Sequence, residues 1–306
     1  MSVAAIDCGT NSVRLLIADV EEDGVLREHL RVMRIVRLGE GIDRTGEFSR
    51  DALLRLFAAL DEFAGLMAVN GVVRTRFVAT SASRDARNRN EFVRGVLERV
   101  GVEPEVIPGT EEAALSFVGA IRGLPPGRVT SPALIVDIGG GSTEFVLGDT
   151  TPDIATSVNI GCVRMTERHL VSDPPTSEQV AATRADIREA IRLAGEVVPF
   201  DRARTLVGLA GSVTTVAAMA LNLPEYDEKV LHGSVITAEE VAEAARRLTA
   251  MTRAERTELP YMHPGRVDVI AGGAMVLDEI LAATGAPEVV VSETDILDGI
   301  VYSIVT

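Results

Sequence analysis

The sequence predicts an α/β protein built from two similar domains, each a mixed sheet flanked by helices. One strand–turn–strand segment occurs twice, at residues 3–16 and again at residues 133–146. After each copy, stretches with strand and helix periodicity alternate. Residues 123–127 hold two prolines and two glycines, a composition typical of a linker. We therefore expect domains at residues 1–124 and 125–306, with the active cleft between them.

The individual elements follow from apolar periodicity and from turn and capping residues. In the first domain we expect, after the duplicated segment, a strand at 25–38, a helix at 50–68, a strand at 72–79, a helix at 85–100, a short strand at 105–107 and a helix from Thr110 to about Arg122. In the second we expect a strand at 155–160, long helices opened by capping boxes at Thr176 and Thr237, a strand at 206–209, a helix after Gly211, a helix at 269–284 and a strand at 288–291. A closing helix at 296–305 could pack back on the first domain.

The two copies of the duplicated segment align without gaps. Asp7 coincides with Asp137, and a small-residue turn follows each, which we call turn 1 (residues 9–12) and turn 2 (residues 139–142). Glycines let backbone N–H groups approach an anion closely, and an Asp at a strand end can hold a metal or a water. Two unrelated tight hairpins are the alternative, but the shared register favours a phosphate clamp. The predicted phosphate-binding residues are Gly9, Thr10, Asn11 and Ser12 in turn 1, and Gly139, Gly140, Gly141 and Ser142 in turn 2.

The copies differ at one informative position, where Arg14 in the first is replaced by Glu144 in the second. One copy then presents a cation to phosphates, and the other a carboxylate to a metal or a water. Asp7, Asp137 and Glu144 are the predicted metal ligands. An exposed polar position on a hairpin is the simpler explanation of Glu144.

Three further segments could carry chemistry. Glu111 and Glu112 open the helix that begins near Thr110, where a carboxylate can activate a water or merely complement the helix dipole. Arg84 lies where a strand passes into a helix, and it could bind an anion or belong to an ordinary helix start. Gly211 and Ser212 form another strand–turn–helix that suits phosphate, although close packing explains it nearly as well.

Composition limits the kind of partner. The chain has 306 residues and a net charge of −15, which argues against nucleic acid binding. Residues 1–125 carry 16 arginines and 19 acidic residues, a net charge of −3, so the remainder carries −12. A protein of this charge that binds a chain of phosphates needs a divalent metal, Mg²⁺ or Mn²⁺, and a few directed arginines.

Targeting and redox signals are weak. Cys8 and Cys162 cannot form a disulfide framework and fit packing better than redox sensing. No apolar stretch reaches the length of a bilayer span, and the N-terminus enters a strand directly, so we expect a cytoplasmic protein with no membrane partner.

Together, these motifs resemble the exopolyphosphatase and guanosine pentaphosphate phosphohydrolase (Ppx/GppA) family, and the similarity covers nearly the whole chain. The resemblance implies the actin-like, ribonuclease H-like fold shared with sugar kinases and heat-shock ATPases. It implies that Glu112 is the catalytic base, Glu144 its essential partner, Asp137 part of the metal and phosphate site, and Arg84 a phosphate contact. It also implies a homodimer.

The expected activity is release of the terminal phosphate from inorganic polyphosphate. Removal of the 5′ phosphate from guanosine pentaphosphate (pppGpp) is the first alternative, and an ATP-dependent kinase or assembly ATPase of the same fold is a distant one. A phosphate sensor without turnover would not need Glu112 and Glu144. The chain ends at Thr306, and residues 296–299 replace the usual Leu-Arg-Glu-Gly ending of the family, so we expect a preference for short chains.

Overall fold

The computed structural model describes residues 2–21 and 24–305 of the chain. They fall into two compact units, unit 1 comprising Met1–Gly119 with Ile296–Thr306, and unit 2 comprising Ala120–Asp295. The chain leaves unit 1 within helix α5 (Gly109–Gly123), near the predicted boundary at residue 124. The closing helix α13 (Ile296–Val305) belongs to unit 1.

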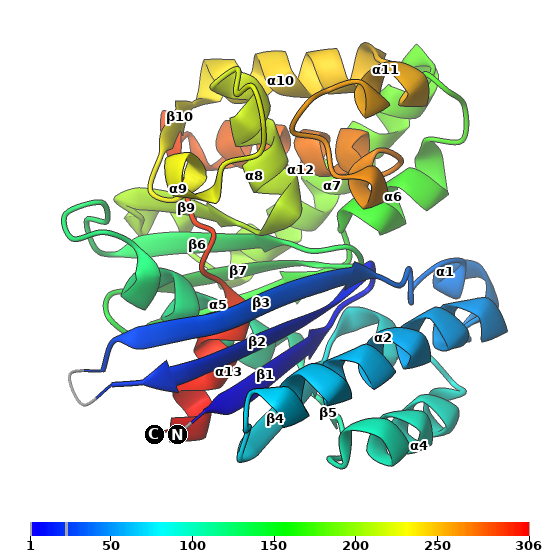
Figure 1. Cartoon of the computed structure of the whole chain (residues 1–306). Coiled ribbons are helices and arrows are strands. Elements are labelled where there is room, and N and C mark those ends of the chain that lie inside the picture. Colours follow the sequence, from blue (N-terminus) through cyan, green and yellow to red (C-terminus); the bar gives the residue numbers. More distant parts are fainter. Residues whose placement is uncertain (1, 22–23, 306) are drawn as a thin grey trace. The chain divides into compact units, whose positions relative to one another are not determined.

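Unit 1 contains a five-stranded mixed sheet (Figure 1). Its strands are β1 (Val3–Cys8), β2 (Ser12–Val20), β3 (Leu26–Ile35), β4 (Arg74–Ala79) and β5 (Glu105–Val106). They lie in the order β3-β2-β1-β4-β5. The first three form an antiparallel meander, and β4 lies parallel to β1 on its other side.

Helices cover both faces of this sheet. The helices are α1 (Ile42–Thr45), α2 (Arg50–Val69), α3 (Ser81–Asp85), α4 (Arg89–Val100), the first part of α5, and α13. Alternate residues of β1 point to opposite faces, so Ile6 joins the core with α2 and α4 while Ala5 joins the core with α13. Residues far apart in the sequence therefore close unit 1: its last helix packs against β1 and β2 (Figure 1).

Unit 2 contains a six-stranded mixed sheet of similar plan (Figure 1). Its strands are β6 (Ala133–Ile138), β7 (Thr143–Gly148), β8 (Pro152–Val158), β9 (Thr205–Leu209), β10 (Val235–Thr237) and β11 (Glu288–Val291). They lie in the order β10-β11-β9-β6-β7-β8. As in unit 1, an antiparallel meander begins the sheet and a later strand, β9, lies parallel to the first.

The helices of unit 2 build one large apolar core. They are α6 (Cys162–His169), α7 (Ser177–Val197), α8 (Ala210–Ala220), α9 (Glu228–Leu231), α10 (Ala238–Ala250), α11 (Arg253–Thr257) and α12 (Ile270–Thr284), with short 3₁₀ turns at Phe200–Arg202 and Pro264–Arg266. Helix α12 is central, because it packs against α6, α7, α8 and α10. Its buried residues join β6, β7 and β9 in the core.

The predicted fold class is confirmed, whereas the bounds of several predicted elements differ from the structure; β8, for example, spans Pro152–Val158 instead of residues 155–160. Residues 85–100 are not one helix: α3 ends at Asp85 and α4 begins at Arg89, because Asn88 exchanges two hydrogen bonds with the backbone of Phe48 (2.9 and 3.1 Å). Helix α5 begins at Gly109, one residue before the expected cap at Thr110, and the N–H groups of Glu111 and Glu112 donate to the carbonyl oxygen of Pro108. The two predicted capping boxes, opened by Thr176 and Thr237, are both present.

Candidate active site

Turn 1 links β1 to β2 and is held in place by the chain that follows β3. The N–H group of Gly9 donates to the carbonyl oxygen of Ser12 at 2.9 Å. The carbonyl oxygens of Thr10 and Asn11 accept hydrogen bonds from backbone N–H groups of residues 36–39. The hydroxyl group of Thr10 is buried and has no hydrogen-bond partner among the described residues. A buried hydroxyl group usually has a partner, so this atom is a candidate ligand contact.

Asp7 and Arg14 form an ion pair at the base of turn 1. They face each other on β1 and β2, and Nη2 of Arg14 donates to Oδ2 of Asp7 at 2.6 Å, with Nε at 3.0 Å. Asp7 is buried. The predicted cation of this copy therefore balances the charge of the predicted metal ligand beside it. The assignments of Arg14 to phosphate and of Asp7 to a metal stay predictions.

Arg84 and Glu112, predicted as a phosphate contact and a catalytic base, lie together in unit 1. Nη1 of Arg84 donates to Oε2 of Glu112 at 2.8 Å and to the carbonyl oxygen of Ile107 at 3.0 Å. Glu112 is buried, so Arg84 holds this carboxylate in a setting with little access to bulk water. Near Arg84, the hydroxyl group of Ser83 is buried without a partner in the described part of the chain.

The neighbouring carboxylate, Glu111, has a different setting. It pairs with Arg76 at 2.7 Å, and Arg76 also binds Glu105 at 2.7 Å. The Glu111 side chain is 42% exposed, against 12% for Glu112. The two adjacent acids thus have different surroundings, and of the two only Glu112 is both buried and beside Arg84.

Turn 2 presents backbone N–H groups and keeps its carbonyl oxygens occupied. The N–H group of Gly139 donates to the carbonyl oxygen of Ser142 at 3.0 Å, as Gly9 does to Ser12 in turn 1. The start of α6 donates to the carbonyl oxygens of Gly139 and Gly140, and Nε of Arg164 donates to that of Gly141 at 2.7 Å. The N–H groups of Gly140 and Gly141 donate to no described residue. Such a turn can accept an anion.

Asp137 and Glu144 lie opposite each other where β6 and β7 meet turn 2. They occupy the positions that Asp7 and Arg14 occupy in unit 1. Both are buried, and Oε1 of Glu144 accepts hydrogen bonds from Ser142 at 2.6 Å and Ser157 at 2.7 Å. Two like charges facing each other on adjacent strands are unfavourable without a cation or a proton. Unit 2 therefore places two carboxylates at the paired positions where unit 1 has a carboxylate and a guanidinium group.

The first turn of α8, which follows β9 directly, carries the predicted phosphate residues Gly211 and Ser212, and we call residues 209–212 the β9–α8 turn. Ala210 has a positive φ of 68°, an unusual conformation for a residue with a side chain. A Cβ atom on Gly211 would lie 2.2 Å from Cζ of Arg266, so the guanidinium group lies directly against this turn. Nη1 of Arg266 also donates to Oγ1 of Thr215 at 3.2 Å. Sequence reasoning does not place Arg266 beside this turn, because only tertiary packing brings the two segments together.

The two cysteines are packing residues in their settings. Both are buried, and burial raises the pKa of each thiol, that of Cys8 well above its usual value. A thiol with a raised pKa is poorly reactive.

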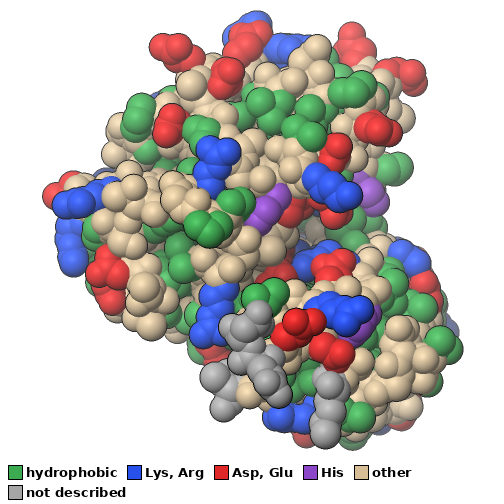
Figure 2. All heavy atoms as spheres, turned by 60° about the vertical axis from the view of Figure 1, so that its left-hand side comes forward, with side chains coloured by type: hydrophobic (Ala, Val, Ile, Leu, Met, Phe, Trp, Pro, Cys, Tyr) green, Lys and Arg blue, Asp and Glu red, His purple; other side chains and the backbone are tan. Residues whose placement is uncertain are grey.

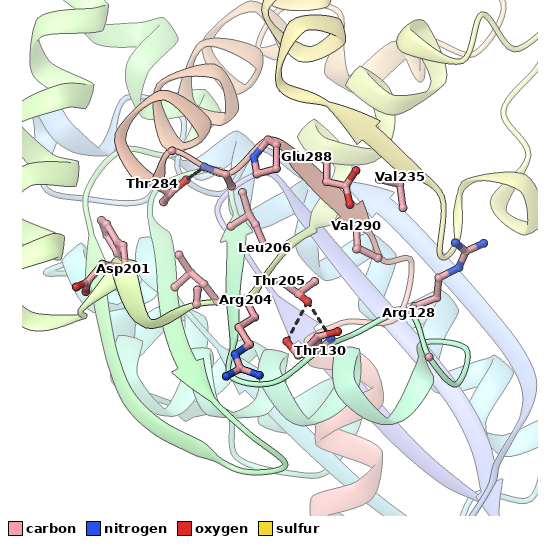
Figure 3. Close-up of a pocket in the computed structure, with 17 residues that line it drawn as sticks. Arg128, Thr130, Asp201, Arg204, Thr205, Leu206, Val235, Thr284, Glu288 and Val290 are labelled. Atoms are coloured by element: carbon pink, nitrogen blue, oxygen red, sulfur yellow. Dashed lines mark hydrogen bonds between the residues drawn. The ribbon is translucent and has the colours of Figure 1, made fainter.

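A pocket of about 450 Å³ lies in unit 2 at the ends of the strands that are opposite to turn 2 (Figure 3). It is lined by the first residues of β6, β9 and β11, whereas turn 2 and the β9–α8 turn follow the last residues of β6 and β9. Thr130 and Thr205 exchange hydrogen bonds within it. In open α/β sheets ligands bind at the carboxyl ends of the strands, so the turns remain the better candidates.

The described residues offer neither a preformed metal cluster nor a membrane-spanning helix. No group of three or more His, Cys, Asp or Glu side chains there forms a ready-made metal site. No helix in that part of the chain is long and apolar enough to span a membrane. Acidic and basic side chains are interspersed on the face drawn in Figure 2.

Known proteins resemble this chain over its full length. The sequence pattern of the Ppx/GppA phosphatase family matches residues 16–306. Exopolyphosphatase 2 of Mycobacterium tuberculosis is 46% identical over 314 residues, which covers 99% of this chain and 98% of that protein.

Solved structures agree with the sequence match. An exopolyphosphatase-like protein superposes with a TM-score of 0.96 at 45% identity, covering 99% of this chain and 97% of the other. A Ppx/GppA enzyme of Aquifex aeolicus superposes with a TM-score of 0.82 at 31% identity, covering 99% of each chain.

Proposed function

The chain belongs to the Ppx/GppA phosphatase family, and we propose that it is an exopolyphosphatase that hydrolyses the terminal phosphate of inorganic polyphosphate. The observation that carries this proposal is the arrangement of turn 2. Its carbonyl oxygens are bound by α6 and Arg164, while the N–H groups of Gly140 and Gly141 are left to a ligand. N–H groups presented in this way suit the oxygens of a phosphate chain.

Both turns are proposed phosphate-binding elements. Turn 1 repeats the hydrogen bond from glycine to serine seen in turn 2, and it adds the buried hydroxyl group of Thr10. Phosphoryl transfer depends mainly on positioning and on charge stabilisation. Turns fixed by neighbouring backbone segments supply that positioning without reorganisation.

Glu112 is the proposed base for the attacking water. Its partner Arg84 fixes the position of one of its carboxylate oxygens, at 2.8 Å. Burial limits competition from bulk water, which strengthens the interaction of the carboxylate with a bound water. Glu111 is less buried, with 42% of its side chain exposed, and it is bound by Arg76 instead of Arg84.

Asp137 and Glu144 are the proposed metal ligands. Two buried carboxylates that face each other fit a divalent cation, and Mg²⁺ is commonly held by one or two carboxylates together with substrate phosphates and water. Mg²⁺ or Mn²⁺ bound there would neutralise charge on the phosphates. Asp7 would contribute less, because Arg14 already balances its charge.

The test is phosphate release from tripolyphosphate, long-chain polyphosphate, pppGpp and ATP, measured side by side with Mg²⁺. We expect hydrolysis of polyphosphate, with ATP a poor substrate. Faster phosphate release from pppGpp than from any polyphosphate would instead indicate that pppGpp is the preferred substrate. Hydrolysis of none of the four would end the proposal.

A further inference from the structure

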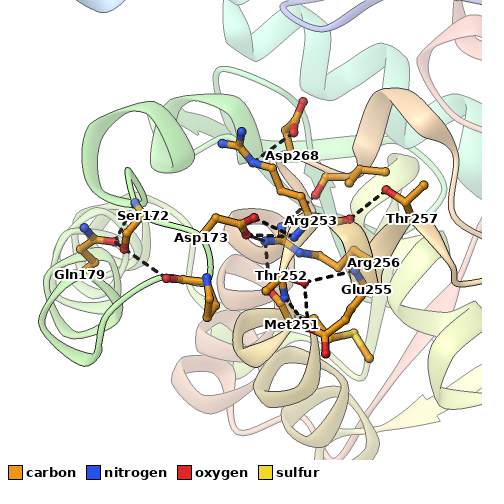
Figure 4. Close-up of polar contacts among 12 residues, drawn as sticks. Ser172, Asp173, Gln179, Met251, Thr252, Arg253, Glu255, Arg256, Thr257 and Asp268 are labelled. Atoms are coloured by element: carbon orange, nitrogen blue, oxygen red, sulfur yellow. Dashed lines mark hydrogen bonds and ion pairs between the residues drawn. The ribbon is translucent and has the colours of Figure 1, made fainter.

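Arg256, on the short helix α11, is an almost completely buried cation in unit 2. It is 3% exposed. Nη1 donates to the carbonyl oxygen of Val267 at 2.8 Å, and Nη2 donates to that of Met251 at 3.2 Å and to Oδ1 of Asp173 at 3.3 Å (Figure 4). Burial lowers the pKa of Arg256, mainly through loss of hydration. A charge in such a place is costly unless it is well paired.

The pairing of Arg256 is incomplete. Its Nε has no hydrogen-bond partner in the described part of the chain, and its one carboxylate partner, Asp173, is shared. The backbone N–H group of Arg253 also donates to Asp173, at 2.9 and 3.1 Å. Buried ion pairs often contribute little net stability compared with apolar residues of similar volume. Stability alone therefore gives a poor account of an arginine here.

Two side chains of α11 bind residues 267–268, the segment that lies shortly before α12 begins. Arg256 holds the carbonyl oxygen of Val267, and Nε of Arg253 lies 3.3 Å from Oδ1 of Asp268 (Figure 4). Two successive residues of this segment are thus bound to one short helix. The capping box of Thr252 and Glu255 fixes where that helix begins.

The residue immediately before this segment is Arg266, whose guanidinium group lies against the β9–α8 turn. It contacts Oγ1 of Thr215 at 3.2 Å and occupies the space that a side chain at Gly211 would need. The position of Arg266 therefore depends on where the backbone of Val267 is held. A shift of about 1 Å in a group that positions a substrate can cost about 10²-fold in rate.

We propose that Arg256 is a positioning residue: by holding the carbonyl oxygen of Val267, it sets Arg266 against the β9–α8 turn, where Arg266 binds a phosphate of the substrate. This inference rests on the proposed polyphosphate substrate. Arg256 itself does not touch the substrate and acts only through Arg266. Its removal therefore affects substrate binding only while Arg266 is present.

The test is a double-mutant cycle with Arg256→Met and Arg266→Ala. The readouts are kcat and KM for tripolyphosphate, the Kd for tripolyphosphate measured by calorimetry, and the melting temperature. We expect each single variant to raise KM and Kd about tenfold, with a smaller change in kcat. The double variant should bind no more weakly than Arg266→Ala alone. If Arg256→Met folds poorly, Arg256→Lys replaces it in the cycle, with a smaller expected effect in the same direction.

A matched control separates positioning from stability. Arg184 also binds a buried carboxylate, Glu279, and this ion pair joins α7 to α12. Arg184→Met should lower the melting temperature while KM and Kd stay within twofold of the parent values.

Two results would overturn the inference. One is equal weakening by Arg256→Met in the parent and in the Arg266→Ala background, and the other is a lowered melting temperature with unchanged KM and Kd. A parent protein that binds tripolyphosphate without hydrolysing it would refute the proposed function instead, and the cycle in Kd would still decide the role of Arg256.

Discussion

Replacing Gly161 by alanine should place a methyl group inside the backbone of turn 2. The new Cβ would lie 2.3 Å from both the carbonyl carbon and oxygen of Gly140, and 2.4 Å from the nitrogen of Gly141. Non-bonded carbon contacts are normally about 3.5–4.0 Å, so the turn or α6 must move by about 1 Å. Gly161 has a φ of −84°, which alanine adopts without strain. The effect of the substitution is therefore purely steric.

The expected loss of activity follows from that displacement. A misplacement of about 1 Å can cost about 10²-fold in rate, and forced overpacking costs about 1–3 kcal/mol of stability. Initial rates of phosphate release from tripolyphosphate and urea unfolding measure the two effects. The control is Gly65→Ala, on an exposed face of α2 with no atom within 4 Å of the added Cβ. It should keep full turnover and gain about 0.5–1 kcal/mol.

A folded Gly161→Ala protein with turnover within threefold of the parent would refute this reasoning. It would show that the position of turn 2 does not limit catalysis.

Four other predictions follow from the same structure. Glu112→Gln should lower kcat by about 10²–10⁴ while tripolyphosphate still binds, whereas Glu111→Gln should cost far less; similar losses in both variants would contradict the assignment of the base. Chelation should abolish hydrolysis, Mg²⁺ should restore it, and Asp137→Asn should raise the Mg²⁺ concentration needed for half-maximal rate; full activity in excess chelator would exclude a metal. Burial raises the pKa of Glu293 to about 7 from its usual 4.5, so the folded state binds a proton that the unfolded state releases, and this stabilisation is present below pH 4.5 and lost as pH rises through 7. Between pH 5 and pH 8, the free energy of unfolding of the parent, measured in urea, should therefore fall by about 2 kcal/mol more than that of Glu293→Gln, at 1.36 kcal/mol per pKa unit. If the two proteins differ in stability by the same amount at both pH values, the pKa of Glu293 is not raised. Long polyphosphate should shorten gradually as a whole population, because the net charge of −12 beyond residue 125 disfavours retention of a long anion; full-length chains that vanish without intermediates on a gel would indicate processive action.

The elements that sequence reasoning placed well are those with local signals. The helices that start after Thr176 and Thr237 have both members of a capping box within four residues, and both boxes form as expected. Helix breaks that depend on distant partners were missed. The break before α4 comes from the hydrogen bonds between Asn88 and Phe48, which lie 40 residues apart.

In the candidate site too, features that depend on neighbouring residues could be predicted, and features that depend on pairing between strands could not. The duplicated strand–turn–strand could be predicted because each turn is closed by its own residues, as the bonds from Gly9 to Ser12 and from Gly139 to Ser142 show. The pairing of Asp7 with Arg14 was not anticipated, although both lie in one hairpin, because it depends on the register of β1 and β2.

By itself, the sequence determined the duplication, the identity of the two turns and the kinds of side chain beside them, because these are properties of short segments. Only the tertiary structure decided which side chains act together. It brought Arg84 to Glu112, Gly161 against Gly140, and the buried Arg256 to Val267. The partners in each pair are separated in the chain, and no local propensity records the contact. Packing of buried side chains into a dense interior permits few arrangements of such segments, and that constraint exists only in the folded chain.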